Sequence, residues 1–412
     1  MGKLLKIAFR NLLRYKRRTF LTISLVTLGV VFVLVFVSVS GSFKAMMIAQ
    51  NTDSMLGHLQ VHRKGYVASI DTLPLNLNLK AGAVGRLEKA LAAQPEIEAY
   101  SLRVKFGAMF STFTETTNIR LNGVDPAREF AAVPLLAGRV LEGKKNIERG
   151  EIWVPELLAR GMKVKAGDTV VVIATNQDGS VNGKQLRVSA ILESATGPGG
   201  RDGYIHIEDA AEVLRMDGRE VSEVAVRLVD FRGLGSFTER LTNLLEKELN
   251  QQGKPIFEVH SWEKLSPFYN IARMIDVMTF FMKLMLIAIV LVSIMNVMIM
   301  AVYERIREIG TIAAIGTLPG RILSLFVLEG LSLGIGGAIL GNVVGAIVLF
   351  VLNMAGITYD FGRQKGLVLQ AKIDPGEVLL LSAIVIVISV AASIQPAFKA
   401  SRMEPIKALR HV

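Results

Sequence analysis

The sequence predicts a membrane protein with four transmembrane α-helices and a large mixed α+β extracytoplasmic domain inserted between the first and second of them. Hydrophobic residues make up 51% of the 412 residues, which is more than a soluble protein of this length usually carries. Four runs contain no charged side chain and reach the roughly 20 residues that a helix needs to cross a bilayer. These runs are 19–43, 284–303, 330–359 and 378–398.

The first run is longer than the apolar region of a cleaved signal peptide, which spans about 7 to 15 residues. We therefore expect an uncleaved first span at 19–43. The preceding residues 1–18 combine apolar positions on one stripe with basic residues elsewhere. They predict an amphipathic helix on the inner leaflet, although a basic flank that only sets the topology fits as well.

The net charge of +11 is concentrated in three segments that four spans would place on one side of the membrane. Residues 1–18, the loop 303–322 and the tail from 399 carry 14 basic and 3 acidic residues, which accounts for the whole excess. This distribution is typical of cytoplasmic segments of membrane proteins. It predicts a multi-pass membrane protein with both termini in the cytoplasm, and it argues against nucleic-acid binding.

The segment 44–271 is long enough to form its own hydrophobic core, and it contains no cysteine for disulfides. Strand-like alternation and helix-like spacing are mixed along it. Gly167 to Ile191 predicts a β-hairpin that turns near Asp178 and Gly179. We expect a porter-like part formed by 55–124 and 221–263, interrupted by a β-rich insert at 125–218.

The remaining chain is divided by its apolar runs and breakers. A stalk and second span are expected at 272–303, a charged cytoplasmic helix at 304–322, the third span at 323–359, a short external loop at 360–377, the fourth span at 378–398 and a cytoplasmic tail at 399–412. Gly337, Gly341 and Gly345 repeat every four residues in the third span, which favours close helix packing. The partner of this glycine face is either another span of the same chain or a second subunit.

The sequence lacks the residue patterns that bind nucleotide or metal or that couple transport to an ion gradient. The nearest match to a phosphate-binding loop, GSVNGKQ at 179–185, has the wrong spacing and no Ser or Thr for magnesium. The five histidines have no ligand partners at metal-binding spacing, and the apolar runs have no ionisable residue for ion coupling. We therefore expect a non-catalytic subunit that binds no metal or cofactor itself.

The segment YERIREIGTIAAIGTLPGRI, at 303–322, combines an apolar stripe with charged residues and ends at Gly316, Pro319 and Gly320. Such a helix is able to dock into a groove of a cytoplasmic partner, with Arg305 and Glu308 facing solvent or that partner. A solvated loop with an interfacial helix fits the composition as well. Glu329 follows at the entrance of the third span.

The same segment, extended to Gly330, resembles the signature of the MacB/FtsX-like ABC transporter permease family. The tail QPAFKASRMEPIKALRHV resembles the closing motif of that family. The opening KIAFRNLLRYKRRTFLT and the MLGHLQVHRKGY after the first span are similar to its lipoprotein-releasing branch. The resemblance implies a site that couples the chain to an ATPase. Its residues are Glu304, Arg305, Arg307, Glu308, Ile309, Gly310, Ala314, Ile315 and Gly316.

The resemblance further implies a permease of the bacterial inner membrane. It pairs with a second permease copy, either identical or a paralogue, and with an ABC ATPase dimer on separate chains that binds ATP and Mg. In such systems ATP-driven motion passes through the membrane by mechanotransmission and extracts a lipoprotein or other amphiphile from the outer leaflet, sometimes toward a periplasmic acceptor. Signal transmission to a cell-wall hydrolase and MacB-like efflux of peptides or antibiotics are the alternatives. The hairpin at 175–184 is polar, unlike the carrier-binding hairpin of the lipoprotein-releasing branch.

Overall fold

The computed structural model describes residues 7, 8, 10, 11, 14–194, 202–216, 218–361, 364–368 and 370–404. The chain divides into two compact units. The helical unit comprises Met1–Ala45, Ala272–Tyr359 and Leu367–Val412, and the sheet unit comprises Met46–Ile271 and Asp360–Gly366. Of the predicted tail motif at 395–412, residues 405–412 lie outside the described residues.

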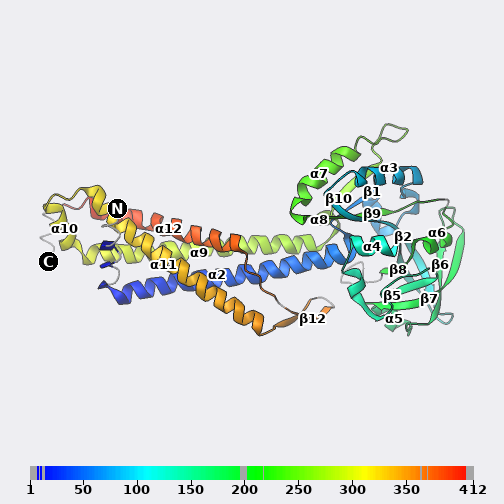
Figure 1. Cartoon of the computed structure of the whole chain (residues 1–412), viewed down its shortest axis with the longest axis horizontal. Coiled ribbons are helices and arrows are strands. Elements are labelled where there is room, and N and C mark those ends of the chain that lie inside the picture. The colour runs from blue at the N-terminus through cyan, green and yellow to red at the C-terminus, as the bar shows by residue number, and fades with distance from the viewer. Residues whose placement is uncertain are drawn as a thin grey trace. The chain divides into compact units, whose positions relative to one another are not determined.

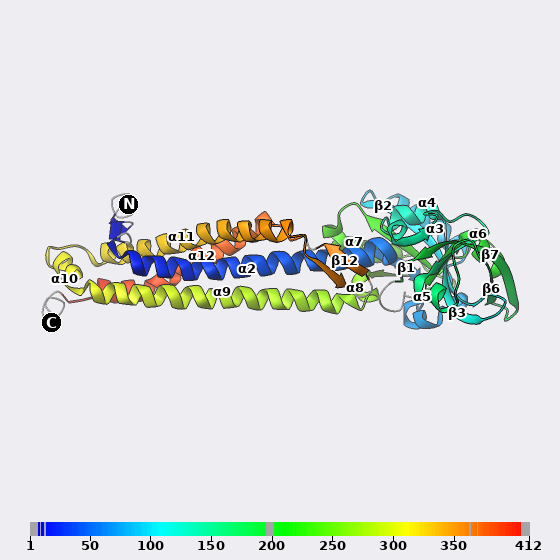
Figure 2. The same cartoon turned by 90° about the horizontal axis from the view of Figure 1, so that it is seen from below.

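Four long apolar helices form the helical unit, as the charge-free runs predicted (Figures 1 and 2). They are α2 (Lys16–Asn51), α9 (Phe268–Glu304), α11 (Pro319–Met354) and α12 (Pro375–Ser401). Each is long and apolar enough to cross a membrane. The short helix α10 (Ile306–Ala314) joins α9 to α11, and the strands β11 (Thr358–Phe361) and β12 (Gln364–Val368) pair between α11 and α12.

Several helix boundaries differ from the expected ones. Residues 304–322 do not form one helix, because α10 has nine residues and α11 begins at Pro319. Proline suits the first turn of a helix, where its missing N–H removes no hydrogen bond, so α11 starts there and contains Glu329. The helix α9 begins at Phe268, four residues before the expected stalk.

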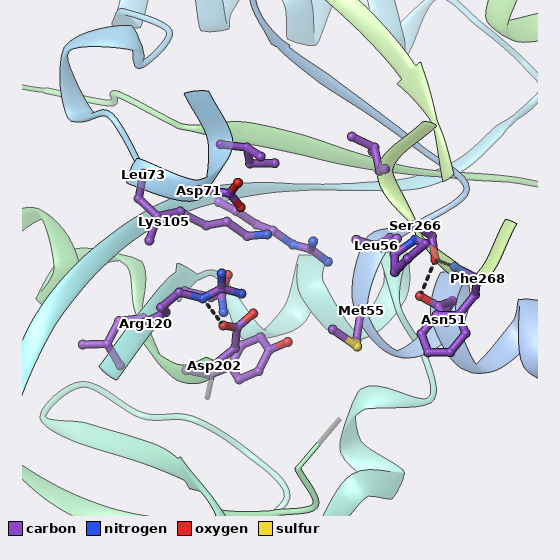
Figure 3. A pocket seen from close by; sticks show the side chains of 17 residues that line it. Asn51, Met55, Leu56, Asp71, Leu73, Lys105, Arg120, Asp202, Ser266 and Phe268 are labelled. Carbon is purple, nitrogen blue, oxygen red and sulfur yellow. Dashed lines mark hydrogen bonds and ion pairs between the residues drawn. The ribbon is translucent and has the colours of Figure 1, made fainter. Parts of the chain in front are cut away.

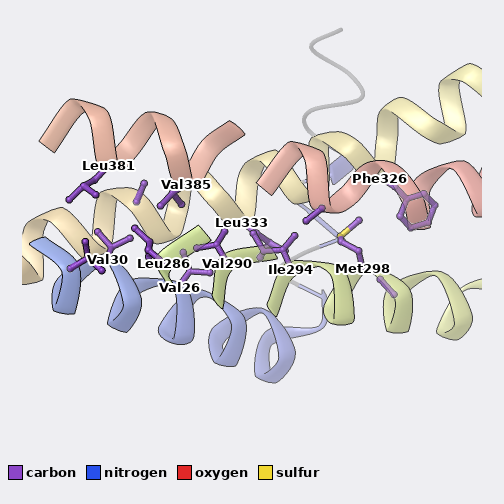
Figure 4. Packing of buried hydrophobic residues seen from close by; sticks show 14 of the residues in the cluster. Val26, Val30, Leu286, Val290, Ile294, Met298, Phe326, Leu333, Leu381 and Val385 are labelled. Atoms are coloured by element: carbon purple, nitrogen blue, oxygen red, sulfur yellow. The ribbon is translucent and has the colours of Figure 1, made fainter. Parts of the chain in front are cut away.

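Buried aliphatic side chains from all four helices form the core of the helical unit (Figure 4). Val26 and Val30 of α2 lie beside Leu286 and Val290 of α9, and further along the unit α9 contributes Ile294 and Met298. The other labelled members come from α11 and α12, namely Phe326, Leu333, Leu381 and Val385. The outward faces of these helices keep large apolar side chains exposed, which suits contact with lipid.

One ten-stranded sheet organises the sheet unit, in the order β10-β1-β9-β2-β3-β8-β5-β7-β4, with β6 paired to β2 and β7. Its strands are β1 (Leu59–Arg63), β2 (Ile97–Ser111), β3 (Thr116–Val124), β4 (Val140–Gly143), β5 (Glu151–Pro155), β6 (Thr169–Thr175), β7 (Val181–Leu192), β8 (Asp202–His206), β9 (Glu223–Leu228) and β10 (Phe257–Ser261). The β3–β8 and β5–β7 pairs are parallel and the others antiparallel.

The expected porter-like part and β-rich insert are neighbouring halves of this one sheet. Strands β10, β1, β9, β2 and β3 come from the porter-like segments, and β4 to β8 come from the insert. The halves meet where β3 pairs with β8 and where β2 pairs with β6. They therefore share a continuous hydrogen-bonded ladder.

Seven helical segments of the sheet unit precede, separate or follow its strands along the chain. They are α3 (Ala81–Ala92), α4 (Pro126–Ala132), α5 (Glu156–Gly161), α6 (Ile207–Val213), α7 (Leu234–Leu245), α8 (Trp262–Leu265) and the π-helical turn η1 (Thr52–Leu56). Four short 3₁₀ turns, η2 (Val67–Thr72), η3 (Leu75–Leu77), η4 (Leu136–Arg139) and η6 (Phe231–Gly233), complete the described elements. The predicted hairpin is present as β6–β7, and Gly179 takes a positive φ of 82° in its turn.

Candidate functional site

The joint between α9 and α10 is formed by a single residue that leaves the helical conformation. Arg305 has φ −112° and ψ 16°, so α9 ends at Glu304 and α10 begins at Ile306. At its other end α10 stops before Gly316, whose φ of +91° reverses the chain ahead of α11. The nine residues of α10 thus lie between two breaks in the helical backbone.

Arg305 lies inside the helical unit, which overturns the expectation that it faces solvent or a partner. Its Nη1 donates to Oε1 of Glu329 at 2.8 Å, and its Nε donates to Oε2 of Glu308 at 3.0 Å. The side chains of Arg305 and Glu329 are only 7% and 3% exposed. The cause is Glu329, because a buried carboxylate on an apolar helix requires a cation beside it.

The surroundings keep this arginine charged. Burial alone would lower the pKa of Arg305, but Glu329 and Glu308 outweigh that effect and raise the pKa above its ordinary value. The guanidinium also lies 5.5 Å from the centre of the Phe326 ring, a cation–π distance. Arg305 therefore joins α10 to α11 as a permanent cation.

The N-terminal segment contacts the same joint. Asn11 Nδ2 donates to Glu329 Oε1 at 2.7 Å, Arg14 Nη1 lies 3.0 Å from Glu308 Oε1, and Arg18 Nη1 lies 2.5 Å from Glu304 Oε2. Asn11 and Arg14 precede a turn at Tyr15, and Arg18 lies in the first turn of α2, so side chains from both sides of this turn reach the joint. Only part of the predicted helix at 1–18 is described, and the turn at Tyr15 divides it.

The predicted coupling residues divide between the interior and the surface. Ile306, Ile309 and Gly310 are buried, so the apolar stripe of α10 packs largely inside its own chain. The exposed members are Glu304, Arg307, Ala314, Ile315 and Gly316, and Glu308 is half-buried. Ile315 is 78% exposed, which is unusual for so apolar a side chain. The surface open to a partner is therefore the C-terminal end of α10 together with the charged residues around the joint.

The glycine face of α11 packs against α2 of the same chain. A Cβ added at Gly337, Gly341 or Gly345 would lie 2.5, 2.5 and 2.8 Å from the nearest atom of an α2 side chain. Those side chains are Val26, Val30 and Leu34 in turn. Two earlier glycines, Gly330 and Gly334, approach Ser393 and Ser389 of α12 in the same way. Glycine thus permits α11 to approach two neighbouring helices closely.

An apolar groove of about 680 Å³ runs between α2 and α9. Its lining residues are Leu25, Leu28, Gly29, Phe32, Ala288, Ile289, Val292 and Ser293. Leu25, Leu28 and Phe32 are about half exposed or more, so the groove opens to the outside of the unit. The sequence did not predict its lining residues, because they depend on how α2 and α9 pack against each other.

A second, smaller cavity of about 170 Å³ lies within the sheet unit (Figure 3). Arg120 Nε lies 2.7 Å from Asp202 on one side, and Met55 and Phe268 line the opposite side. Lys105, which also lines it, reaches Glu223 at 3.0 Å. Its cations are thus already paired with carboxylates, and the lining defines no ligand class.

Arg103 also lines this cavity, and it is enclosed between two buried carboxylates. Its guanidinium lies 2.7 Å from Glu129 and 2.9 Å from Glu223, and all three side chains are at most 2% exposed. Burial alone would raise the pKa of Glu223, but Lys105 and other neighbours hold it well below its usual range. In the part of the chain that the structure describes, no group of three or more His, Asp or Glu side chains is placed to hold a metal.

The four apolar helices, the short helix at a charged joint and the mixed α/β unit are the features of a multi-pass membrane protein with a large folded domain. The chain belongs to the MacB/FtsX-like family of ABC transporter permeases. A family model for the MacB-like periplasmic core domain matches residues 19–244, and one for the FtsX-like permease C-terminal matches residues 280–405. The predicted family is confirmed, and its members are permease subunits in the bacterial inner membrane.

Named relatives come from two branches of this family. The chain is 24% identical over 415 residues to the lipoprotein-releasing system transmembrane protein LolC of Neisseria meningitidis serogroup B, covering 95% of this chain and 94% of LolC. It is 25% identical to the macrolide export ATP-binding/permease protein MacB of Bdellovibrio bacteriovorus, covering 71% of this chain and 44% of MacB. The periplasmic region of MacB from Actinobacillus actinomycetemcomitans is a similar solved structure, with 14% identity, a TM-score of 0.36 and coverage of 51% of this chain and 92% of that one.

Proposed function

We propose that this chain is the permease subunit of an ABC transporter that extracts a lipoprotein or another amphiphile from the outer leaflet of the inner membrane. A separate ATPase dimer binds ATP and Mg and drives the motion, and a second permease copy completes the membrane part. Both termini and α10 lie in the cytoplasm, and the sheet unit lies in the periplasm. The observation that carries the proposal is the apolar groove between α2 and α9, whose lining suits acyl chains.

The groove favours an amphiphile over a polar cargo. Seven of its eight lining residues have no polar side-chain group, and Ser293 uses its hydroxyl to donate to the carbonyl of Ile289 in its own helix. A polar substrate would leave its own hydrogen-bonding groups unsatisfied in such a groove, which costs free energy. Acyl chains have no such groups and gain from burial.

The proposed site of energy input is the exposed end of α10 with the charged residues around the joint. Ile315 and Leu318 are 78% and 64% exposed, and both lie in or beside the turn that follows α10. Exposed apolar side chains beside charged ones are typical of a protein-binding surface. An ATPase that binds there moves α10, and α10 moves α11 and the packed spans.

The direct test is release of an acylated lipoprotein from proteoliposomes that contain this chain and the ATPase encoded beside it. We expect release that requires ATP, and we expect Val292→Trp to abolish it by filling the groove while the ATPase still binds. Val387→Trp, at an exposed position on α12 away from the groove, is the matched control and retains release. If ATP is hydrolysed without any release, while a cell-wall hydrolase is activated instead, the protein is a signal transmitter and the proposal is wrong.

A further inference from the structure

We propose that Arg305 and Glu329 form a positioning pair that fixes α10 to α11, so that the two helices move as one body. The inference rests on the proposed function, because it concerns how motion imposed on α10 reaches the membrane spans. Neither residue needs to touch the ATPase or the substrate. Their role is to prevent α10 from tilting on its own.

The backbone alone does not hold α10 rigidly. The helix has only nine residues, and a non-helical residue lies beyond each end, Arg305 before it and Gly316 after it. Each break interrupts the ladder of backbone hydrogen bonds that makes a helix stiff. Without side-chain contacts, a force on α10 would rotate it about these two breaks and would not reach α11.

Arg305 bridges the two helices at this point. One arm of its guanidinium bonds Glu308 in the first turn of α10, and another bonds Glu329 on α11. Glu329 lies ten positions after Pro319, which places it about 15 Å along α11. The bridge therefore reaches past the start of α11 into its buried part, where the helix is packed on its neighbours.

The bridge is directional, unlike the apolar contacts around it. Buried Ile306 and Ile309 also hold α10, but apolar contacts have no preferred direction and allow sliding. Charge-assisted hydrogen bonds fix both distance and angle, and separating a buried ion pair leaves an uncompensated charge. Asn11 donates a further hydrogen bond to Glu329, so the N-terminal segment is joined to the same point.

The variants separate positioning from ordinary stabilisation. Arg305→Gln removes the cation. The double variant Arg305→Glu with Glu329→Arg, called the charge exchange below, restores an ion pair with the two charges in exchanged positions. Arg305→Lys keeps the charge but lacks the planar guanidinium, whose separate Nε and Nη1 atoms bond the two carboxylates in this geometry. The matched control is Lys283→Gln, which removes the partner of Glu377 in a 2.8 Å ion pair between α9 and α12 of the same unit.

The first measurement is lipoprotein released per ATP hydrolysed by the reconstituted complex. We expect Arg305→Gln to assemble and hydrolyse ATP with release per ATP lowered about ten-fold, which is within the range of coupling changes caused by single substitutions. We expect Lys283→Gln to stay within about two-fold of the parent, since a part-exposed pair contributes little. The charge exchange should recover a large part of the loss, and Arg305→Lys should be intermediate. An equal loss in Arg305→Gln and Lys283→Gln would overturn the proposal.

The second measurement needs no ATPase. The sequence has no cysteine, so spin labels can be attached at two introduced cysteines, Thr311→Cys on α10 and Leu331→Cys on α11. We expect a narrow distance distribution in the parent, a broad one with Arg305→Gln and a narrow one again with the charge exchange. An unchanged distribution with Arg305→Gln would refute the pair even if the complex transports. If the parent complex releases nothing, the proposed function fails, and the label distances alone decide whether the pair positions α10.

Discussion

Replacing Gly341 by alanine is expected to destabilise the packing of α11 on α2. The new Cβ would lie 2.5 Å from Val30 Cβ and 2.6 Å from Val30 Cγ1. Carbon atoms that are not bonded normally approach to about 3.5–4.0 Å, so one or both helices must shift by about 1 Å. Val30 cannot rotate away, because its Cβ is attached directly to the backbone. Overpacking of this kind costs about 1–3 kcal/mol, and Gly341→Leu, which adds three more carbons, costs more.

Two other glycines of α11 provide graded controls. At Gly345 the closest atom is the flexible Cδ2 of Leu34 at 2.8 Å, so we expect Gly345→Ala to be milder. At Gly336 the closest atom is Ile23 Cδ1 at 3.6 Å, an ordinary contact, so Gly336→Ala should change the free energy of unfolding by less than about 1 kcal/mol.

The assay is unfolding by denaturing detergent in mixed micelles, followed by helical circular dichroism, with the oligomeric state measured in parallel. We expect the unfolding midpoint to fall in the order Gly336→Ala, Gly345→Ala, Gly341→Ala, without a change of oligomeric state. Equal midpoints for Gly341→Ala and Gly336→Ala would refute the reasoning. A loss of subunit assembly at an unchanged midpoint would assign the glycine face to a subunit interface instead.

Three further predictions concern other parts of the chain. Burial alone would raise the pKa of Glu223, but Lys105 and other neighbours lower it by more, so the carboxylate stabilises the sheet unit fully above about pH 4.5 and this contribution is lost as the pH falls through the lower folded pKa. Amide protection factors of the full chain, which are corrected for the pH dependence of intrinsic exchange, should fall there, and less steeply with Glu223→Gln. Reversing both Arg305 and Glu308 should impair assembly as well as coupling, because Arg305→Glu places a second carboxylate beside buried Glu329, whereas Arg305→Gln leaves a neutral amide that can still donate a hydrogen bond there. Glu308→Arg alone should assemble normally by size-exclusion chromatography, and normal assembly of the double variant would contradict this. Val292→Trp should lower the binding of a fluorescent acyl chain to the α2–α9 groove, and unchanged binding would remove the groove as the acyl site.

Local patterns in the sequence predicted the elements of the fold well. Charge-free runs indicated the four spans, because charged side chains are costly in lipid and leave a clear pattern. The β6–β7 hairpin followed from strand alternation around Gly179, whose positive φ few other residues adopt. The spacing of Gly337, Gly341 and Gly345 predicted close packing. Val26, Val30 and Leu34 repeat at the same spacing in the first span, a signal that would have suggested the partner helix.

Contacts between distant segments could not be predicted in this way. Arg305 reads as a surface residue in a charged segment, and its burial depends on Glu329, 24 positions later on another helix. The groove between α2 and α9 and the shared sheet of the two expected parts likewise depend on which faces meet. Each depends on tertiary packing. Periodicity along one segment does not show which other segment that face will contact.

Crosslinking from Ile315 tests most directly whether an ATPase drives this permease through α10. A photoreactive amino acid at this exposed position, in the complex co-expressed with the neighbouring ATPase, should form an adduct with that ATPase, and the yield should change between the nucleotide-free and ATP-bound states. ATP-driven lipoprotein release by a complex in which residue 315 never crosslinks to the ATPase, in either state, would contradict the proposed route of energy input.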